Sequence, residues 1–321
     1  MTDYKNLKLI ATSSPHIRAA ENTRSIMLDV IIAMMPALIW AIVKFGFRAL
    51  TLTAVSVVGC MFFEWGYRKL MKKPQSVNDL SAAVTGILLA FVCPVNMPYW
   101  MILVGDFFAI VVVKQLFGGI GMNFANPALV GRIVLFVSFA GAMNNWVFPD
   151  AAVDQLSSAT PLAVADPNKL SLLDLFMGVH GGVLGETCAL AIVQGLIYLV
   201  VTKTISIAIP AAYVGSMFVF YLIATHSVHA ALVAVLSGGL LFGAVFMATD
   251  YVTSPFTLKG KLVYGVALGV VTFAIRYWGS YTEGVSFALL FMNLWVPYIN
   301  DLTRQTPYGY VKPAKKEAAG K

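Results

Sequence analysis

A short segment rich in hydroxyl groups carries the most distinctive chemistry in the sequence. It reads Asp154-Gln155-Leu156-Ser157-Ser158-Ala159-Thr160-Pro161-Leu162. Thr160 directly precedes a proline, and this order predicts a helix N-cap, since proline is favoured at the first helical position. A helix N-terminus also attracts phosphate, because its backbone N–H groups and its dipole both favour negative charge. The residue types leave two interpretations open: a plain helix cap, or a hydroxyl that carries a phosphorylated cofactor.

Five ionisable residues lie inside or at the ends of long apolar runs, where charge is costly and often functional. Asp29 suits a position near the membrane surface, and Asp106 suits a hydrogen bond between helices. Arg132 fits bidentate binding of a phosphate as well as pairing with a buried acid. Glu186 begins an apolar run, where it is either a helix cap or a site residue. Asp250 ends such a run and is a candidate for a cofactor site or an ion pathway.

Several other kinds of site are not expected. The sequence contains no Walker A loop, no HExxH, no GxSxG and no dinucleotide-binding fingerprint. Its cysteines are not paired in a CxxC motif, and we expect them to be small buried apolar residues. His226 and His229 have no third ligand nearby, so we expect a solvated turn and no metal site. The cysteines are Cys60, Cys93 and Cys188.

The apolar residues run continuously, as in membrane-spanning segments. The chain of 321 residues is 59% hydrophobic and only 12% charged, whereas soluble domains carry about 25% charge. Runs of about 20 apolar residues match the hydrocarbon core of a bilayer. The sequence predicts an all-α, polytopic integral membrane protein with about ten transmembrane helices. The predicted segments are 25–44, 48–66, 79–93, 99–114, 126–143, 183–202, 205–225, 229–248, 261–278 and 283–300.

Two of these segments, 79–93 and 99–114, are short, and the proline-containing stretch 93–98 separates them. Fifteen residues of helix reach about 23 Å, less than the thickness of the hydrocarbon core. The pair is therefore expected to be half-helices or tilted pieces. A break at this depth is tolerated only where protein buries it or where it lines a cavity.

The basic residues are distributed unevenly between the two membrane sides of the predicted topology. With ten spans, most Lys and Arg fall on the side of the two termini. The formal net charge of the chain, +7, is then a topology signal and no indication of nucleic-acid binding. This asymmetry predicts that both termini are cytoplasmic and that the long loop 144–182 is extracytoplasmic. The basic residues expected on the outer side are Lys44, Arg48, Lys169 and Arg276.

Five spans on each side of that loop predict two halves of opposite orientation, an inverted repeat. Leu80-Ser81 recurs as Leu236-Ser237, and Gly121 with Phe124 recurs as Gly284 with Phe287. The predicted organisation is a tail (1–24), a first five-helix repeat (25–143), the loop (144–182), a second five-helix repeat (183–300) and a basic tail (301–321). Broken helices in an inverted repeat also suit a channel or a secondary transporter without redox chemistry. A structural membrane scaffold is a third possibility.

The segment around Thr160 resembles the flavin-attachment motif of the NqrB/RnfD family, membrane subunits of ion-translocating electron-transport complexes. Dispersed motifs extend the resemblance along most of the chain. They are Ser14-Pro15-His16, the stretch 117–128 that contains Asn123, Gly131-Arg132, Gly185-Glu186-Thr187, and Ala248-Thr249-Asp250-Tyr251-Val252-Thr253-Ser254-Pro255. The chain lacks the long N-terminal extension typical of NqrB, so the RnfD branch is the closer match. Ser158 stands where the family often has Gly.

The resemblance implies a function. FMN would be joined through its phosphate to the Thr160 hydroxyl, which makes Thr160 a phosphoryl threonine. A dedicated flavin transferase would form this bond and would read Asp154. With Asp154, the motif residues Ser157, Ser158 and Ala159 are further candidates for the cofactor site. A second flavin, non-covalent riboflavin, would lie deeper in the helix bundle. Arg132, Asn123, Glu186, Thr249 and Asp250 are the candidate cofactor-binding residues within the membrane domain.

The resemblance also implies a location in the inner (plasma) membrane of a bacterium or archaeon, and it implies partners. The chain would carry electrons in an Rnf-type complex that couples electron transfer between ferredoxin and NAD to Na⁺ or H⁺ transport. It would work with RnfA, RnfB, RnfC, RnfE and above all the flavin subunit RnfG. With no dinucleotide fold and no cluster ligands of its own, the chain is expected to be incomplete as a catalyst and to have no catalytic residue. The transporter alternative does not need the motif that ends at Thr160.

Overall fold

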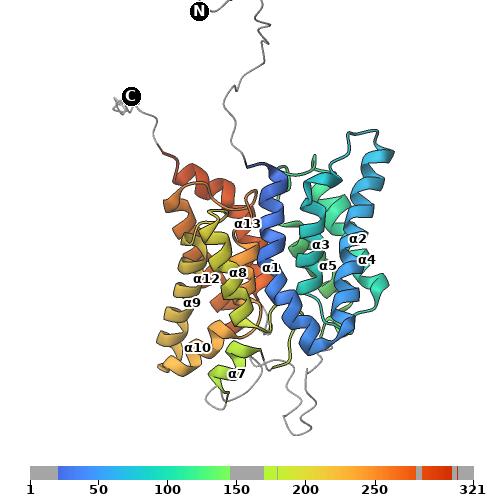
Figure 1. The fold of residues 1–321 in the computed structure, drawn as a ribbon. Coiled ribbons are helices and arrows are strands. Elements are labelled where there is room, and N and C mark those ends of the chain that lie inside the picture. Colours follow the sequence, from blue (N-terminus) through green and yellow to red (C-terminus); the bar gives the residue numbers. More distant parts are fainter. Residues whose placement is uncertain (1–20, 145–169, 179, 280–283, 306–308, 310–321) are drawn as a thin grey trace, which may run out of the picture.

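The structure is a computed structural model, and it describes residues 21–144, 170–178, 180–279, 284–305 and 309. In this part of the chain every regular element is a helix (Figure 1). The all-α prediction is confirmed. The helices stand roughly side by side in one bundle, with loops at its upper and lower ends.

The first half is built from helices of unequal length. Its elements are α1 (Thr23–Phe45), α2 (Phe47–Leu70), the short η2 (Val77–Asp79), α3 (Ser81–Phe91), α4 (Tyr99–Phe107), the π-helix η3 (Phe108–Gln115), α5 (Pro127–Ser138) and α6 (Ala140–Met143). The second half contains α7 (Leu172–Met177), α8 (Ala189–Val201), α9 (Ala208–Thr225), α10 (Val228–Leu236), α11 (Leu240–Phe242), the π-helix η6 (Gly243–Met247), α12 (Leu258–Trp278) and α13 (Val285–Leu302).

Among the described residues, 5 helices are long and apolar enough to cross a membrane, namely α1, α2, α9, α12 and α13. A further span consists of α10 and the stretch Leu240–Met247, which meet at an angle of 64°. The helices α3, α5 and α8 are apolar but shorter, and α4 with η3 occupies the predicted segment 99–114. A polytopic membrane protein is thus confirmed. The count of ten spans stays a prediction.

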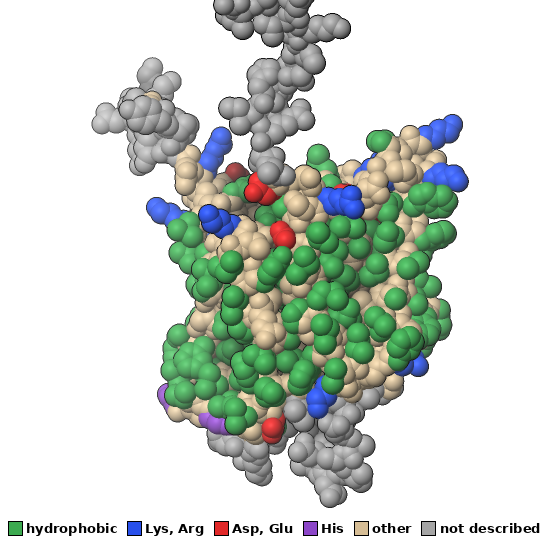
Figure 2. Space-filling model, viewed as in Figure 1, with side chains coloured by type: hydrophobic (Ala, Val, Ile, Leu, Met, Phe, Trp, Pro, Cys, Tyr) green, Lys and Arg blue, Asp and Glu red, His purple; other side chains and the backbone are tan. Residues whose placement is uncertain are grey.

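The outer surface fits a lipid environment. Hydrophobic side chains cover the middle of the molecule, while Lys, Arg, Asp and Glu gather at its upper and lower rims (Figure 2). Large apolar side chains such as Val43, Phe47 and Trp278 are more than two-thirds exposed. Exposed apolar area of this extent is unfavourable in water and expected in a bilayer.

The bundle has two opposite ends, which we name by the elements found there. The terminal face is the end where α1 begins and α13 ends, and the loop face is the end where α7 lies (Figure 1). Arg68 and Lys69 end α2 at the terminal face, and Lys259 begins α12 there. Lys44 ends α1 at the loop face. The two ends of the described bundle therefore lie on one side, as an even number of crossings requires.

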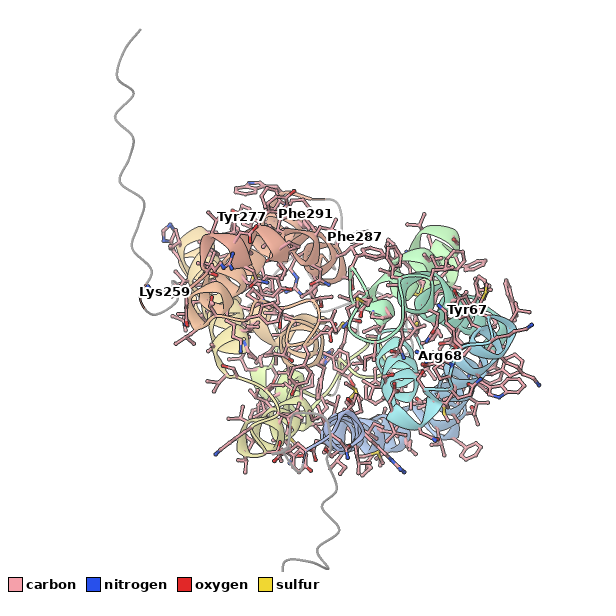
Figure 3. All side chains as sticks on the ribbon, turned by 90° about the horizontal axis from the view of Figure 1, so that it is seen from above. Tyr67, Arg68, Lys259, Tyr277, Phe287 and Phe291 are labelled. Carbon is pink, nitrogen blue, oxygen red and sulfur yellow. The ribbon has the colours of Figure 1, made fainter. Side chains whose placement is uncertain are left out.

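The two halves meet along helices that occupy equivalent places in their sequences. α1 packs against α8, and α5 packs against α13. Seen from above, the first half, with Tyr67 and Arg68, and the second, with Lys259 and Phe291, form two groups side by side (Figure 3). Pairing of equivalent helices is what a two-fold axis in the membrane plane produces. The inverted repeat itself stays a prediction.

The short helix α3 is held in the core by close backbone contact. All of its residues are buried. Eleven residues span only about 16 Å, and the non-helical stretch 92–98 follows, as the sequence predicts. Gly86 allows the approach to α2: a Cβ built on it would lie 2.8 Å from the Val57 Cα and 2.9 Å from the Ser56 carbonyl oxygen. Because both of these atoms belong to backbone, neither is able to swing away.

Gly86→Ala is therefore expected to lower stability by about 1–3 kcal/mol, the usual cost of overpacking a core. Gly66→Ala on α2 is the matched control, since no atom lies within 4 Å of its built Cβ; helix propensity should leave that variant unchanged or slightly more stable. Thermal unfolding of both variants in detergent measures the difference. Equal melting temperatures would contradict the close α2–α3 contact.

Candidate functional site

A cavity of about 310 Å³ opens between the two halves near the terminal face. Its volume is at the lower end of the range for small-molecule sites. The first half contributes residues of α1, α3 and the loop before α5, and the second half contributes the stretch 250–252. The polar side chains among its lining residues are Thr23, Ser81, Thr85, Lys114, Asn123, Asn126, Asp250 and Tyr251.

The loop between η3 and α5 supplies the two asparagines. Asn126 caps α5 by accepting a hydrogen bond of 3.0 Å from the Ala128 backbone nitrogen. The Asn123 amide donates to the Ala125 carbonyl oxygen at 2.9 Å. Both side chains are buried. Three glycines in the same loop have φ between +90° and +125°, a region that residues with a Cβ rarely adopt, and this fixes the path that brings the asparagines to the cavity.

The second half presents an acid and hydroxyl groups to the same cavity. Asp250 Oδ2 accepts a 3.0 Å hydrogen bond from the Thr253 hydroxyl. The side chain keeps some exposure, yet burial raises the pKa of its carboxyl. The Thr249 hydroxyl donates to the Val245 carbonyl oxygen at 2.6 Å, so it satisfies a backbone carbonyl near the end of η6. The structure thus brings Asn123 and Asp250 together at one cavity and places Thr249 next to it.

Behind the cavity lies a buried ion pair that the sequence patterns do not identify. Lys114 Nζ lies 2.8 Å from Glu64 Oε2, and both side chains are almost fully buried. Lys114 also donates to the Ser81 hydroxyl at 2.6 Å, and the Gln115 amide donates to Glu64 Oε1 at 3.0 Å. The π-helix η3 carries both Lys114 and Gln115. Sorting by charge places Lys114 among the basic loop residues, and only the position of Glu64 within an apolar helix signals a buried partner.

A second buried ion pair lies at the centre of the molecule. Arg132 Nη1 lies 3.6 Å from Glu186 Oε1 and donates to the Ser286 hydroxyl at 2.5 Å. Of the two alternatives for Arg132, the described residues show the pairing with a buried acid. Glu186 does not cap α8, since that helix begins after Cys188 without a side-chain cap. Glu186 instead packs on Gly239, where a Cβ would collide with its carboxylate.

The stretch that carries Glu186 is tied to the break in the first half. The Gly185 backbone nitrogen donates to the Phe91 carbonyl oxygen at 2.8 Å, at the end of α3. Glu186 thus connects the break after α3, the break at Gly239 between α10 and α11, and Arg132 on α5. Broken helices at membrane depth require such partners in the protein.

The flavin-attachment candidates lie outside the described residues, since the structure leaves out 145–169. These candidates are Asp154, Ser157, Ser158, Ala159 and Thr160. The described ends that flank them, Asn144 after α6 and the start of α7, both lie at the loop face. The cavity lies near the opposite face.

The remaining polar candidates have ordinary partners within the bundle. Asp29 accepts a hydrogen bond of 3.0 Å from the Tyr198 hydroxyl. Asp106 forms hydrogen bonds with α2, which is the helix–helix hydrogen bonding expected for it. The three cysteines are buried and free.

The Glu64–Lys114 pair gives a stability prediction. Lys114→Met leaves the buried Glu64 with Arg68 as its nearest cation, 3.9 Å from Oε1. Loss of one partner of a buried pair costs about 3–5 kcal/mol, and we expect the lower end of that range. The double variant Glu64→Gln with Lys114→Met removes both charges and should recover much of that loss. Unfolding in detergent of the two single variants and the double variant measures the coupling between these residues. Additive losses would show that the two charges do not stabilise each other.

Comparison with known proteins gives a consistent result. The family model described as NQR2, RnfD, RnfE matches residues 10–309. The D component of the Na⁺-translocating ferredoxin:NAD⁺ oxidoreductase complex of Acetobacterium woodii is 45% identical over 318 residues, which are 97% of this chain and 98% of that protein. The D component of the proton-translocating ferredoxin:NAD⁺ oxidoreductase complex of Clostridium ljungdahlii is 34% identical over 95% of this chain and 97% of its own length.

A third relative extends the comparison. The D component of an ion-translocating oxidoreductase complex of Actinobacillus succinogenes is 34% identical over 93% of this chain and 97% of its own length. These matches cover both helix-rich halves and the loop between them. The chain therefore belongs to the NQR2, RnfD, RnfE family.

Proposed function

We propose that the chain is the RnfD-type membrane component of an Rnf complex, in which it carries electrons between ferredoxin and NAD and takes part in ion transport. The observation that carries this proposal is the 45% identity to such a component over 97% of the chain. Its likeness to relatives from both a sodium-translocating and a proton-translocating complex leaves Na⁺ and H⁺ equally compatible. Other Rnf subunits, with RnfG delivering electrons to this chain, would be its partners.

Covalent FMN on Thr160 is the second part of the proposal. The motif that ends at Thr160 supports it, together with the position of the flanking ends at the loop face. A phosphate ester would tether the flavin at the membrane surface, where a flavin transferase and RnfG have access. The flavin supplies the redox chemistry, and the protein sets its position and environment. Both termini then lie in the cytoplasm, on the side rich in Lys and Arg.

A non-covalent riboflavin in the cavity at the terminal face is the third part. The cavity combines apolar walls with amide, hydroxyl and charged groups, which is the composition expected of a cofactor site. Flavin rings present hydrogen-bond donors and acceptors that Asn123, Asn126 and Thr85 are placed to meet. A flavin there and a flavin on the loop would lie on opposite sides of the membrane, so that electrons cross it within this chain.

Thr160→Ala is expected to abolish covalent flavin without unfolding the protein. The substitution removes one hydroxyl and one methyl group, and none of the described helices contains residue 160. In-gel fluorescence of the denatured chain, produced with its flavin transferase, followed by the mass of the Thr160 peptide, measures attachment. Thr225→Ala is the matched control: it makes the same replacement at the end of α9, outside the motif, and should keep the label. Undiminished fluorescence in the Thr160 variant would refute the attachment site.

Thr85→Leu is expected to lower the content of non-covalent flavin at least tenfold, because it adds bulk and removes a hydroxyl from the cavity wall. Thr85→Ser keeps the hydroxyl that donates to the Ser81 carbonyl oxygen at 3.0 Å and serves as the control. Flavin extracted by acid precipitation, normalised to protein, reports the loss. Covalent FMN on Thr160 should stay unchanged in both variants. Full riboflavin content in Thr85→Leu would place the second flavin elsewhere.

A further inference from the structure

Asp106 is a carboxyl enclosed inside the first half, away from the cavity and from the ion pair at the centre. It lies on α4 and is 0% exposed. Its Oδ1 lies 2.7 Å from the Ser56 hydroxyl and 3.2 Å from the Cys60 sulfur, both on α2. Its Oδ2 is buried and has no hydrogen-bond partner among the described residues. A carboxylate with a bare oxygen in such surroundings is very unfavourable.

Counting hydrogens at Ser56 shows where a proton must be. The Ser56 oxygen lies 2.9 Å from the Gly86 carbonyl oxygen as well as 2.7 Å from Asp106 Oδ1. A serine hydroxyl has a single hydrogen to donate. If Ser56 donates it to the Gly86 carbonyl, the short contact with Asp106 needs a hydrogen from the carboxyl. A protonated Asp106 satisfies the whole chain: Asp106 donates to Ser56, and Ser56 donates to Gly86.

The cations on the neighbouring helices of the described bundle have partners other than Asp106. On α2, Arg48 donates to the Val95 carbonyl oxygen, Arg68 lies 3.9 Å from Glu64 Oε1 and Lys69 lies over the Trp65 ring. On η3, Lys114 forms its ion pair with Glu64 of α2. On α5, Arg132 lies against Glu186. α2 also contributes the Cys60 thiol, and α3 carries no titratable side chain. The charged groups around Asp106 are thus committed elsewhere, which leaves a proton as the means to keep it neutral.

The space beside Oδ2 excludes a larger cation. A Cβ built on Gly59 would lie 2.8 Å from Asp106 Oδ2 and 2.6 Å from the Leu103 side chain. The backbone of α2 therefore packs directly on this oxygen. The other nearby ligands are one hydroxyl, one thiol and one carbonyl oxygen that already belongs to α3. A proton fits this position, and a hydrated metal ion does not.

A polar stripe connects the site with the terminal face. Ser56, Cys60, Glu64 and Arg68 follow one another at intervals of four residues on α2, so they share one side of that helix. The stripe ends at Arg68, beside the Pro74 carbonyl oxygen at the terminal face. On α4 the helix changes to a π-helix two residues after Asp106, and such irregular turns are frequent at functional sites.

We propose that Asp106 is a proton-binding site, a neutral carboxylic acid that donates its proton to Ser56 in the middle of the first half. The stripe on α2 gives this proton a route to the terminal face. Asp106 lies outside the cavity proposed to hold riboflavin, so the proton-binding proposal and the riboflavin proposal can be tested independently.

Infrared spectra of the full-length chain in lipid at pH 7 test this directly. The wild type should show the C=O stretch of a protonated carboxyl, which shifts in D₂O and is lost in Asp106→Asn. Asparagine has the same shape and is able to donate to Ser56, so the fold should survive. Asp29→Asn is the control, since it makes the same substitution at a residue near the terminal face that accepts from the Tyr198 hydroxyl. That variant should keep the band assigned to Asp106. Loss of a carboxylate band alone in Asp106→Asn would overturn the proposal.

Ser56→Ala provides a second readout that does not depend on the Asp106 variant. Removing the acceptor should move the carboxyl C=O band of Asp106 to higher frequency while the band remains. Cys60→Ala, which removes only a weak hydrogen-bonding partner of the same oxygen, should cause a smaller shift. A band that stays at its wild-type frequency in Ser56→Ala would show that Ser56 does not accept this proton, and the assignment would fail.

Discussion

Every polar group inside an apolar layer must find its partner within the protein, and this constraint shapes the bundle. This constraint matters most where a helix ends and leaves backbone carbonyl oxygens without helical partners. After α3, the carbonyl oxygens of Val95, Asn96 and Met97 are covered by the Arg48 guanidinium. At the end of α10, Arg276 donates to the Ala234 and Ser237 carbonyl oxygens. In each half, an arginine near the loop face therefore donates to backbone carbonyl oxygens at the end of a helix.

The same constraint explains why the buried charges occur in pairs. An isolated ion in this interior would cost many kcal/mol, and a neighbouring opposite charge with further hydrogen bonds offsets that cost. Arg132 with Glu186 and Lys114 with Glu64 are solutions of this kind. They differ in what they join. The first pair connects the two halves, while the second connects α2 to η3 within one half.

The sequence predicts the helices well, because apolar runs and their breaks are local signals. The proline-containing break after Phe91 and the positions of most helices agree with the structure within a few residues. The sequence does not predict the short helix α7 within 144–182, the start of α8 at Ala189, or the 64° bend inside the predicted segment 229–248. Asp250 and Asn123, candidates from separate motifs, do meet at one cavity. The Glu64–Lys114 pair escapes prediction because its partners stand 50 residues apart, and no pattern along the chain shows that η3 turns Lys114 inward. Similarly, the sequence leaves a phosphate and a buried acid as equal candidates for the partner of Arg132, and only the fold shows that Glu186 lies beside it.

The arrangement of these groups limits how electrons and ions would be coupled. The cavity lies near the terminal face, the described ends that flank the segment with Thr160 lie at the loop face, and the Arg132–Glu186 pair lies between the two halves. A change of charge in the cavity acts first on Lys114, which lines it, and through Lys114 on Glu64. Glu64 belongs to the polar stripe of α2 that leads to Asp106. The Lys114–Glu64 pair therefore connects charge in the cavity electrostatically with protonation of Asp106. Because both side chains of this pair are buried, water and salt screen the interaction little.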